Sequence, residues 1–182
     1  MMINRNKLLK DSESFKNVEK DLAYIVSKIA QDDKLLKLLC LKENQSEPLT
    51  EQEKKEVLKE CVNIVPIVTE DIMSDKGWSD ITIQFSQFVR NGDNPEHRDK
   101  FLVFNVICNL DTVNMQDFKL RPYQIAGRLD ALFDKKALCG SYSINFLTAE
   151  TIAYDEDTLG VSLVYSVTYF NGADRNDEEC VC

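Results

Sequence analysis

Between Arg98 and Phe133 the sequence contains three consecutive segments that decide the fold: FLVFNVICNL (residues 101–110), DTVNMQDFKL (111–120) and RPYQIAGRLDALF (121–133). The first segment alternates so that apolar side chains fall on both faces of a strand: Leu102, Phe104, Val106, Cys108 and Leu110 on one face, and Phe101, Val103 and Ile107 on the other. Apolar residues on both faces are typical of a central strand, so we expect this strand in the middle of a sheet.

The third segment predicts an amphipathic helix. Its apolar residues recur at helical spacing and form one stripe: Ile125, Ala126, Leu129, Leu132 and Phe133. Pro122 suits the first helical turn, where its missing N–H would have no partner in any case. The sequence therefore predicts a polar bend at 111–120 and then a helix from Pro122 to Phe133 that packs on the buried face of the sheet.

Length and composition describe an ordinary globular protein. The chain has 182 residues, of which 43% are hydrophobic and 29% are charged, enough for a sizeable core. The net charge of -9 argues against a surface that grips nucleic acid or an anionic membrane, because both need clustered Lys and Arg. No apolar run approaches the roughly 20 residues that span a bilayer, and residues 1–15 lack the apolar core of a signal peptide. We therefore expect an intracellular protein with no membrane contact.

Six cysteines are present, and most are expected to be buried thiols. Cys40, Cys61 and Cys108 lie in apolar periodic contexts and Cys139 ends an apolar helix, which favours reduced side chains that act as small hydrophobes. Cys180 and Cys182 lie at the C-terminus, where exposure is expected. A zinc site is the less favoured interpretation, because two more ligands would be needed and His97 is the only histidine.

No constellation typical of catalysis occurs in the sequence. A Ser-His-Asp or Cys-His arrangement needs an oriented histidine, and His97 lies in a polar segment between charged neighbours, where a solvated role is expected. No GxxxxGK or GxGxxG pattern occurs, so no phosphate loop is predicted. The carboxylates at 155–157 cluster in a turn but lack the spacing and length of an EF-hand. We therefore expect no enzymatic activity, no cofactor and no metal.

The N-terminal segment, residues 1–63, is predicted to form three helices. The first begins near residues 11–14 and carries apolar residues at spacings of three and four. Asp32 or Asp33 can cap a short second helix (KLLKLLCL), and Thr50 with Glu53 fits the capping box of a third (EQEKKEVLKECVNI). These helices either cover the sheet or protrude from it as a collar.

The remaining chain predicts strands on both sides of the central segments. Residues 64–72 are apolar and β-branched but contain Pro66, which is typical of an edge strand or an extended connector. In ITIQFSQFVR (81–90) Ile81, Ile83, Phe85 and Val89 alternate with polar residues, as in a half-buried strand. NGDNPEHRD (91–99) is a polar loop. Two alternating segments, 142–146 and 159–169, are joined by YDEDT and predict a hairpin.

The inferred order is three helices followed by β-β-β-α-β-β, which defines an α+β fold: an antiparallel sheet packed by a helix, with an N-terminal helical extension. We place the α+β domain at 64–172 and an acidic flexible tail at 173–182. Polar side chains on the outward face of the strands can be solvated or can meet a neighbouring subunit: Thr82, Gln84, Ser86, Ser143, Asn145, Ser162, Ser166 and Thr168.

This order of elements resembles the tail-terminator, tail-completion and neck (head–tail connector) proteins of tailed bacteriophages. The resemblance covers roughly residues 64–170 and is carried by ITIQFSQFVR, FLVFNVICNL, RPYQIAGRLDALF, GSYSINFLTAETIAY and TLGVSLVYSVTYF. That family shares a small α+β fold with an N-terminal helix, an antiparallel sheet, a helix inserted after the third strand, and a closing hairpin. The helical segment 1–63 is longer than in the simplest members and would be an elaboration that grips a neighbouring ring.

The resemblance implies a structural virion protein that forms a six- or twelve-fold ring in the phage neck or tail, around the channel through which DNA passes without specific binding. The implied partners are further copies of the chain and adjacent neck, tail or portal-adaptor proteins, in the host cytoplasm during assembly and then in the virion. We expect interface residues in the polar loop, namely Asn91, Asp93, His97 and Arg98. Trp78 is either an interface anchor or a partly buried aromatic that closes the sheet edge.

Two other interpretations stay open at this point. The first is a non-viral intracellular protein-interaction module of the same α+β fold, which would be a monomer or dimer. The second is an enzyme, with nucleotide processing as its class, in which Asp155 or Glu156 would be the groups to substitute.

Overall fold

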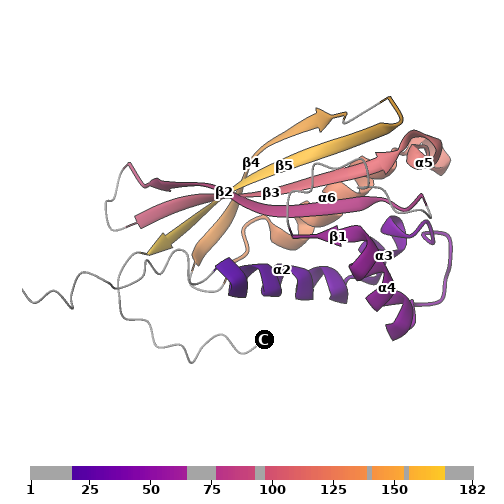
Figure 1. The fold of residues 1–182 in the computed structure, drawn as a ribbon, viewed down its shortest axis with the longest axis horizontal. Helices are drawn as coiled ribbons and strands as arrows, with labels where there is room; N and C mark the ends of the chain where they lie inside the picture. The colour runs from indigo at the N-terminus through magenta and orange to yellow at the C-terminus, as the bar shows by residue number, and fades with distance from the viewer. Residues whose placement is uncertain (1–17, 65–76, 93–96, 139–140, 154–155, 171–182) are drawn as a thin grey trace, which may run out of the picture.

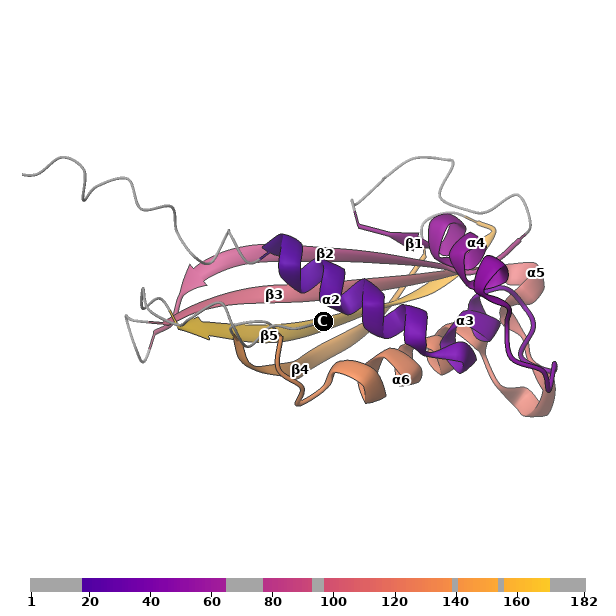
Figure 2. The same cartoon turned by 90° about the horizontal axis from the view of Figure 1, so that it is seen from below.

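The computed structural model describes residues 18–64, 77–92, 97–138, 141–153 and 156–170 (Figure 1). These residues form one sheet, with helices against one of its faces (Figures 1 and 2). The strands are β1 (Val62–Asn63), β2 (Asp80–Arg90), β3 (His97–Asn109), β4 (Ser141–Ile152) and β5 (Thr158–Phe170). The helices are α2 (Val18–Gln31), α3 (Asp33–Leu39), α4 (Glu51–Cys61), α5 (Leu110–Val113), the short 3-10 turn η2 (Gln116–Phe118) and α6 (Arg121–Phe133). The predicted α+β class is confirmed.

The sheet order is β1-β2-β3-β5-β4, so β3 is the central strand, as its apolar faces predicted. Leu102, Phe104, Val106 and Cys108 are completely buried on the face that the helices cover, and Val103 and Ile107 are nearly buried on the other face. β2, β3, β5 and β4 pair antiparallel, whereas the two residues of β1 pair parallel to β2. The insertion of α6 between β3 and β4 lets the chain return to the sheet on the far side of β5.

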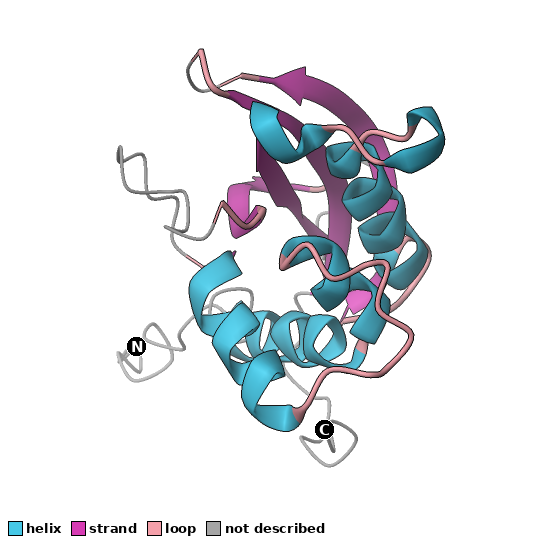
Figure 3. Cartoon of the chain, turned by 90° about the vertical axis from the view of Figure 1, so that its right-hand side faces the viewer, coloured by secondary structure: helices cyan, strands magenta, loops and turns pink. Residues whose placement is uncertain are grey.

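The N-terminal helices cover the sheet and do not form a separate collar. α2 lies across the same face as α6, and Figure 3 shows the helices and the sheet as two adjacent layers. A single hydrophobic cluster joins helices and strands, with Ile25 and Ile29 from α2, Leu36 from α3, and Ile83 and Phe104 from the sheet. Burial of one continuous core therefore attaches α2, α3 and α4 to the strands.

The helix starts follow the local capping chemistry. Asp32 caps α3, since its Oδ1 accepts a hydrogen bond from the Leu35 amide at 3.0 Å. The predicted capping box of α4 is confirmed, because the Glu53 amide donates to Thr50 Oγ1 at 3.3 Å and the Thr50 amide donates to Glu53 Oε2 at 2.8 Å. α4 ends at Cys61, earlier than predicted, because Val62 and Asn63 pair with β2. The predicted start of the first helix at 11–14 lies outside the described residues.

A β-bulge in β2 overturns one predicted orientation. Gln87 has φ +49°, and the register with β3 shifts between Ser86 and Val89. One extra residue turns the following side chains to the opposite face. The prediction that Val89 faces the core is therefore wrong, since it is 43% exposed, and the ring of Phe88 instead lies 5.9 Å from Lys100 Nζ.

The two ends of β3 also differ from the prediction. β3 begins at His97, whose Cα partner is Phe170 of β5, so residues 97–99 belong to a strand and not to the expected polar loop. At its other end the strand stops at Asn109, whose side chain accepts a hydrogen bond from the Asp111 amide at 2.8 Å and caps α5. Leu110 therefore starts a helix and is 42% exposed, not buried on the strand face.

The structure also bears on the predictions for the cysteines, for the outward polar residues and for the segments 64–72 and 173–182. Cys40, Cys61 and Cys108 are buried, as expected, whereas Cys139, Cys180 and Cys182 lie outside the described residues. Most of the outward polar positions are half-buried or exposed, but Thr82 is only 6% exposed, at a position where β2 pairs with β1 on one side and β3 on the other. The strand predicted at 64–72 lies outside the described residues except for Ile64. The predicted tail, 173–182, lies outside them completely.

Candidate functional site

The residues predicted to form an interface lie at two opposite ends of the sheet. Asn91, His97 and Arg98 come together where β2 turns into β3. Trp78 precedes the other end of β2, is half-buried and packs against the hydrophobic core. The 11 residues of β2 separate these ends by roughly 35 Å. Trp78 therefore fits the interpretation of a partly buried aromatic and lies apart from the other three residues, and Asp93 lies outside the described residues.

Hydrogen bonds hold the β2–β3 hairpin end together. The Asn91 amide donates to the His97 carbonyl oxygen at 3.2 Å, and Asn91 Nδ2 donates to Asp99 Oδ2 at 2.9 Å. The other oxygen of Asp99 accepts from the Thr168 hydroxyl at 2.7 Å, which ties the hairpin to β5. The two oxygens of the Asp99 carboxylate thus join β3 to Asn91, which follows β2, and to Thr168 of β5.

A buried ion pair lies between the sheet and α2. Lys100 of β3 and Asp21 of α2 are both 0% exposed, and Lys100 Nζ lies 3.2 Å from Asp21 Oδ2. The Tyr169 hydroxyl donates a hydrogen bond to the same oxygen. Lys100 Nζ also lies 3.6 Å from the centre of the Tyr169 ring and 4.8 Å from that of Phe85, so aromatic faces surround the ammonium group.

Desolvation dominates the electrostatics of this pair. Burial raises the pKa of the Asp21 carboxyl above its usual range, against the opposing effects of the Tyr169 hydroxyl and the Lys100 ammonium. Burial likewise lowers the pKa of Lys100, against the attraction of Asp21. Asp21 Oδ1 has no hydrogen-bond partner among the described residues. The pair therefore joins α2 to the sheet at a high desolvation cost, which makes it sensitive to loss of either partner.

The sequence contained a signal for this pair that the periodicity analysis did not use. Lys100 shares the strand face of Leu102 and Phe104, and Asp21 precedes Ile25 by four residues on the apolar stripe of α2. A charged residue within each of two apolar stripes indicates a buried pair of opposite charges.

At the other end of the sheet, Arg121 joins three helices. Its Nη1 and Nη2 atoms lie 3.0 and 2.7 Å from the two carboxylate oxygens of Glu43, and the Arg121 side chain is 6% exposed. Nη1 also donates to the Leu38 carbonyl at the end of α3, and Nε donates to the Thr112 carbonyl in α5, each at 2.9 Å. The hydrogen bonds from Arg121 hold the pKa of Glu43 below its usual range. These hydrogen bonds of the Arg121 guanidinium therefore fix the start of α6 relative to α3 and α5.

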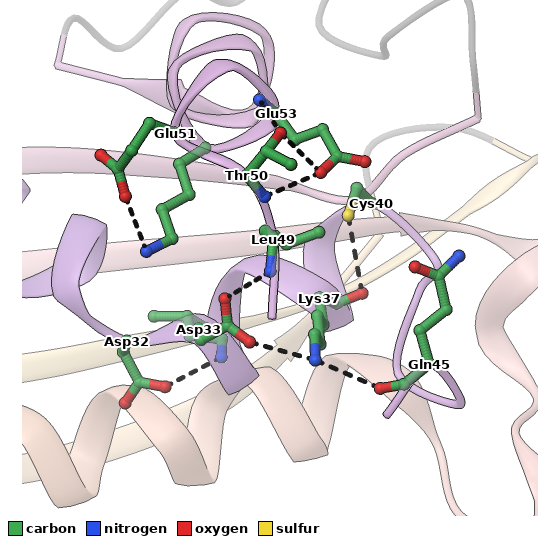
Figure 4. Close-up of polar contacts among 11 residues, drawn as sticks. Asp32, Asp33, Lys37, Cys40, Gln45, Leu49, Thr50, Glu51 and Glu53 are labelled. Carbon is green, nitrogen blue, oxygen red and sulfur yellow. Dashed lines mark hydrogen bonds and ion pairs between the residues drawn. The ribbon is translucent and has the colours of Figure 1, made fainter. Parts of the chain in front are cut away.

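A second polar cluster connects α3 to α4 (Figure 4). Asp33 accepts from the Leu49 amide at 3.0 Å and lies 3.1 Å from Lys37 Nζ, which in turn donates to the Gln45 carbonyl at 3.1 Å. Glu53 completes the cluster on α4, where hydrogen bonds from Lys42 and from the Thr50 cap lower its pKa to about 2. These bonds close the connection 40–50, so their role in the described fold is to join two helices.

The loop before α6 exposes an aromatic side chain. Phe118 is 105% exposed, and Asp117 and Phe118 both have left-handed backbone, with φ of +60° and +59°. That conformation costs a residue with a side chain roughly 1 to 2 kcal/mol. The loop is closed at its base by a bridge between Asn114 and Leu120 and by a 2.8 Å hydrogen bond from the Met115 amide to the Lys119 carbonyl. A polar bend was predicted at residues 111–120, but the exposure of Phe118 was not, because a strained backbone leaves no pattern in the residue types.

An apolar pair is exposed on the edge strand β4. Phe146 is 44% and Leu147 is 50% exposed, at a bulge where the register with β5 shifts between Phe146 and Thr148. The Phe146 amide donates to Asp134 Oδ1 at 3.0 Å, so the pair lies beside the end of α6. Phe146 was predicted to lie in this strand, but the bulge and the exposure of its neighbour Leu147 were not predicted.

In the described ranges, no three His, Cys, Asp or Glu side chains gather in a way that could hold a metal ion. No helix in the described part of the chain has the length and hydropathy that a membrane crossing requires.

The sheet, its covering helices and these clusters form an α+β protein with one hydrophobic core. A comparison with known protein families shows the family to which the chain belongs. The sequence model of the YomW family matches residues 32–167, from the cap of α3 to β5 and well over half of the chain. The chain therefore belongs to the YomW family. The name of that family is phage-derived, from an SPbeta-like prophage, so the protein is phage-related. No curated protein matches the chain significantly.

Proposed function

We propose that this protein is a structural component of the phage particle that assembles as a ring in the neck or tail, as a tail terminator or head–tail connector. It acts there by contact with its neighbours and carries out no chemical step. It is made in the host cytoplasm and is retained in the virion, next to neck, tail or portal-adaptor proteins.

One observation carries this proposal: α6 is inserted between β3 and β4, and β4 and β5 close the antiparallel sheet as a hairpin on the far side of β3. This is the element order that the resemblance to tail-terminator and neck proteins implied. Membership in a phage-related family supports the same direction. The family membership supports a phage protein, and assembly as a ring in the neck or tail is what we propose beyond it.

The polar clusters support a structural role. Asp21 with Lys100, and Glu43 with Arg121, each join elements that are distant in the sequence. Their ionisable groups are used to attach helices to the sheet and to one another. Such cross-links suit a protein that must keep its shape when neighbours bind it.

The net charge of -9 also fits a ring around a DNA channel. An acidic wall repels the phosphate backbone, so DNA passes through without the counter-ion release that drives tight binding. The β2–β3 hairpin end, stiffened by Asn91 and Asp99, is in this proposal a contact surface for the next ring.

Three experiments test the proposal. Light scattering of the purified protein across a concentration series, alone and with candidate neck or tail proteins, should give a closed species near six or twelve subunits. Mass spectrometry of purified particles should detect the chain, and deletion of its gene should leave unjoined heads and tails. Normal, infectious particles from the deletion strain would contradict the proposal. A strict monomer or dimer that is absent from particles would favour the interaction module.

A further inference from the structure

We propose that, in the assembled ring, α2 of each copy of this chain lies on the sheet of the next copy, in the place that α2 takes on its own sheet in Figure 2. This inference rests on the proposed self-assembly and names the element that joins one copy to the next. α2 (Val18–Gln31) is called the arm, and Asp32, between the arm and α3, is called the hinge.

A single residue separates the arm from α3. α2 ends at Gln31 and α3 begins at Asp33, and the hinge residue has φ −94° and ψ 90°, a ψ outside the helical range. The hydrogen bond from the Leu36 amide to the Asp32 carbonyl, at 3.0 Å, already has the spacing of an α-helix. A change of ψ at the hinge therefore turns the arm away from its own sheet and makes α2 and α3 one continuous helix.

The apolar pattern runs through the hinge in the register of one straight helix. Spacings of four and three alternate without a break along the buried stripe, as in a single helical seam: Val18, Leu22, Ile25, Ile29, Asp32, Leu36 and Leu39. Asp32 is the polar member of this series, and it stands where the helix is bent. Two helices that always stay bent need no common register, so the unbroken pattern supports a second, straight state.

Two contacts of the Asp32 carboxylate hold the hinge bent. Its Oδ1 accepts a hydrogen bond from the Leu35 amide at 3.0 Å, and its Oδ2 lies 2.7 Å from Arg128 Nη2. In a straight helix the Leu35 amide would donate to the Gln31 carbonyl, so a helical hydrogen bond would replace the cap. The ion pair then remains as the local contact that favours the bent state, and the Arg128 side chain in it is 40% exposed, which weakens such a pair.

The arm is held on the sheet by few buried residues. Asp21, Ile25 and Ile29 are the buried residues of its 14, whereas α6, on the same face, buries six of its 13. One of the three carries a charge, and the desolvation of Asp21 and Lys100 offsets much of the attraction between them. The arm can therefore leave its sheet more readily than a helix with a wholly apolar stripe.

The sheet of a second copy offers the arm the contacts of its own sheet. The Lys100 ammonium lies among the rings of Phe85 and Tyr169, and it is strongly destabilised without a carboxylate beside it. The helix that covers this face must therefore carry Asp21, whether it comes from the same chain or from a neighbour. Exchange of identical elements remakes every contact, and short hinges favour it. Arms passed from each copy to the next make a head-to-tail contact that can close into a ring.

Charge-reversed variants test whether the arm crosses to another chain. Asp21→Lys places two lysines at the contact and Lys100→Asp places two aspartates there, so each variant alone has like charges on its own or an identical sheet. In an equimolar mixture that is refolded together, exchange of arms brings the introduced lysine of one chain to the introduced aspartate of the other. A chain with both substitutions is the control that shows whether the reversed pair fits.

We expect each variant alone to associate at least about tenfold more weakly than the unchanged protein, and the mixture to form complexes with equal numbers of both chains. Sedimentation velocity and native mass spectrometry measure these species, and circular dichroism checks that each variant folds. Mixed complexes distinguish exchange of arms from a general effect of the substitutions.

A second test leaves the ion pair intact. p-Benzoylphenylalanine replaces Tyr24, which packs against the core, and chains with light and heavy nitrogen are refolded together. After irradiation of the oligomer, arm peptides should be joined to strand peptides of the same and of the other isotope in equal amounts. Without exchange, each arm peptide and its strand peptide carry the same isotope.

The hinge itself provides the third test. Asp32→Ala removes the cap of α3 and the ion pair, so it should lower the concentration at which the oligomer forms by at least about tenfold. Asp32→Asn keeps a capping side chain and should behave nearly as the unchanged protein. Lys34→Ala is the matched control at an exposed position beside the hinge.

Three results would overturn the inference. The first is that the oligomer forms but its arm and strand peptides always share one isotope, in which case the proposed ring still stands and uses other surfaces. The second is that the two charge-reversed chains form no mixed complex although the chain with both substitutions assembles. The third is that the protein stays monomeric at all concentrations, with and without Asp32→Ala. Absence of the chain from particles that assemble normally would instead overturn the proposed function.

Discussion

The buried ion pair between Asp21 and Lys100 allows the sharpest prediction about stability. We consider three variants: Lys100→Met, which leaves the carboxylate without its cation; Asp21→Asn, which leaves the ammonium without its anion; and the double variant. Asn is chosen at 21 because its amide oxygen can still accept the hydrogen bond of the Tyr169 hydroxyl.

The expected magnitude follows from the geometry. At the 3.2 Å separation of Lys100 Nζ and Asp21 Oδ2, two unit charges attract by about 5 kcal/mol at an effective dielectric constant of about 20. This attraction offsets the desolvation of two completely buried groups. Removal of one partner leaves the other charge uncompensated, so each single variant should lose about 3 to 5 kcal/mol of unfolding free energy. The double variant should lose much less than the sum, with a coupling of at least about 3 kcal/mol.

The two single variants should also respond oppositely to pH. In Lys100→Met the pKa of Asp21 is raised in the folded state, so folding takes up a proton and the variant gains stability as the pH falls towards the ordinary carboxyl pKa. In Asp21→Asn the pKa of Lys100 is lowered in the folded state, so folding releases a proton and stability rises as the pH increases towards the ordinary lysine pKa. The double variant should show neither slope.

Urea unfolding, followed by the fluorescence of the single tryptophan, Trp78, at pH 5.5, 7 and 9 measures these quantities. Lys54→Met is the matched control, because Lys54 pairs with an 84% exposed Glu51 side chain and its loss should cost at most about 0.5 kcal/mol. Losses below about 1 kcal/mol in both single variants, with no opposite pH slopes, would refute the reasoning and indicate that water reaches the pair.

Four further predictions concern Arg121, Glu53, Cys108 and Phe118. Arg121→Lys should lower the unfolding free energy by about 2 kcal/mol or more, because a lysine cannot bind both oxygens of Glu43 and both carbonyls, and calorimetry would measure this. The pKa of Glu53 is lowered to about 2 by hydrogen bonds from Lys42 and the Thr50 cap, so its stabilising contribution is complete above the ordinary glutamate pKa and is lost as the pH falls towards 2; Glu53→Gln should remove that part of the acid dependence. Burial raises the pKa of Cys108 to about 11, so peptide mapping should find it unmodified by iodoacetamide at pH 8 until the protein unfolds. Phe118→Gly should change the stability by less than about 1 kcal/mol in either direction, unlike the large loss expected for a packed aromatic, because it removes strain and no buried contact.

A comparison of predicted and observed features, residue by residue, shows which of them the local sequence could predict. The capping box of Thr50 and Glu53, the first-turn position of Pro122 and the central position of β3 were all correct, because each depends on residues within a few positions of one another. The orientation of Val89 was wrong, since a single bulged residue turns the rest of a strand over. The polar loop predicted at 91–99 was too long. His97 has polar neighbours typical of a loop, but it pairs with Phe170 across the sheet.

The candidate contact surfaces depend on the tertiary structure more than the secondary-structure elements do. Asn91, His97 and Arg98 were predicted as interface residues, and they lie near one another because they are close in the chain, whereas the distance of Trp78 from them depends on the extended length of β2. The exposure of Phe118 and Leu147 was not predicted, because a strained loop and an edge-strand bulge decide it.

By itself, the sequence determined the longer helices and strands of the described residues, most of their apolar faces and their order, because hydrophobic periodicity and capping act over a few residues. It did not determine the short elements β1 and α5 or the orientation of Val89. Only the tertiary structure decided that Asp21 meets Lys100 across 79 positions, that Arg121 joins three helices, and that one aromatic residue at a loop tip stays outside the core. The physical reason is that these contacts depend on burial, charge pairing and packing between segments that are distant in the sequence. Such contacts leave only a misplaced charge or an isolated aromatic as a trace in the sequence.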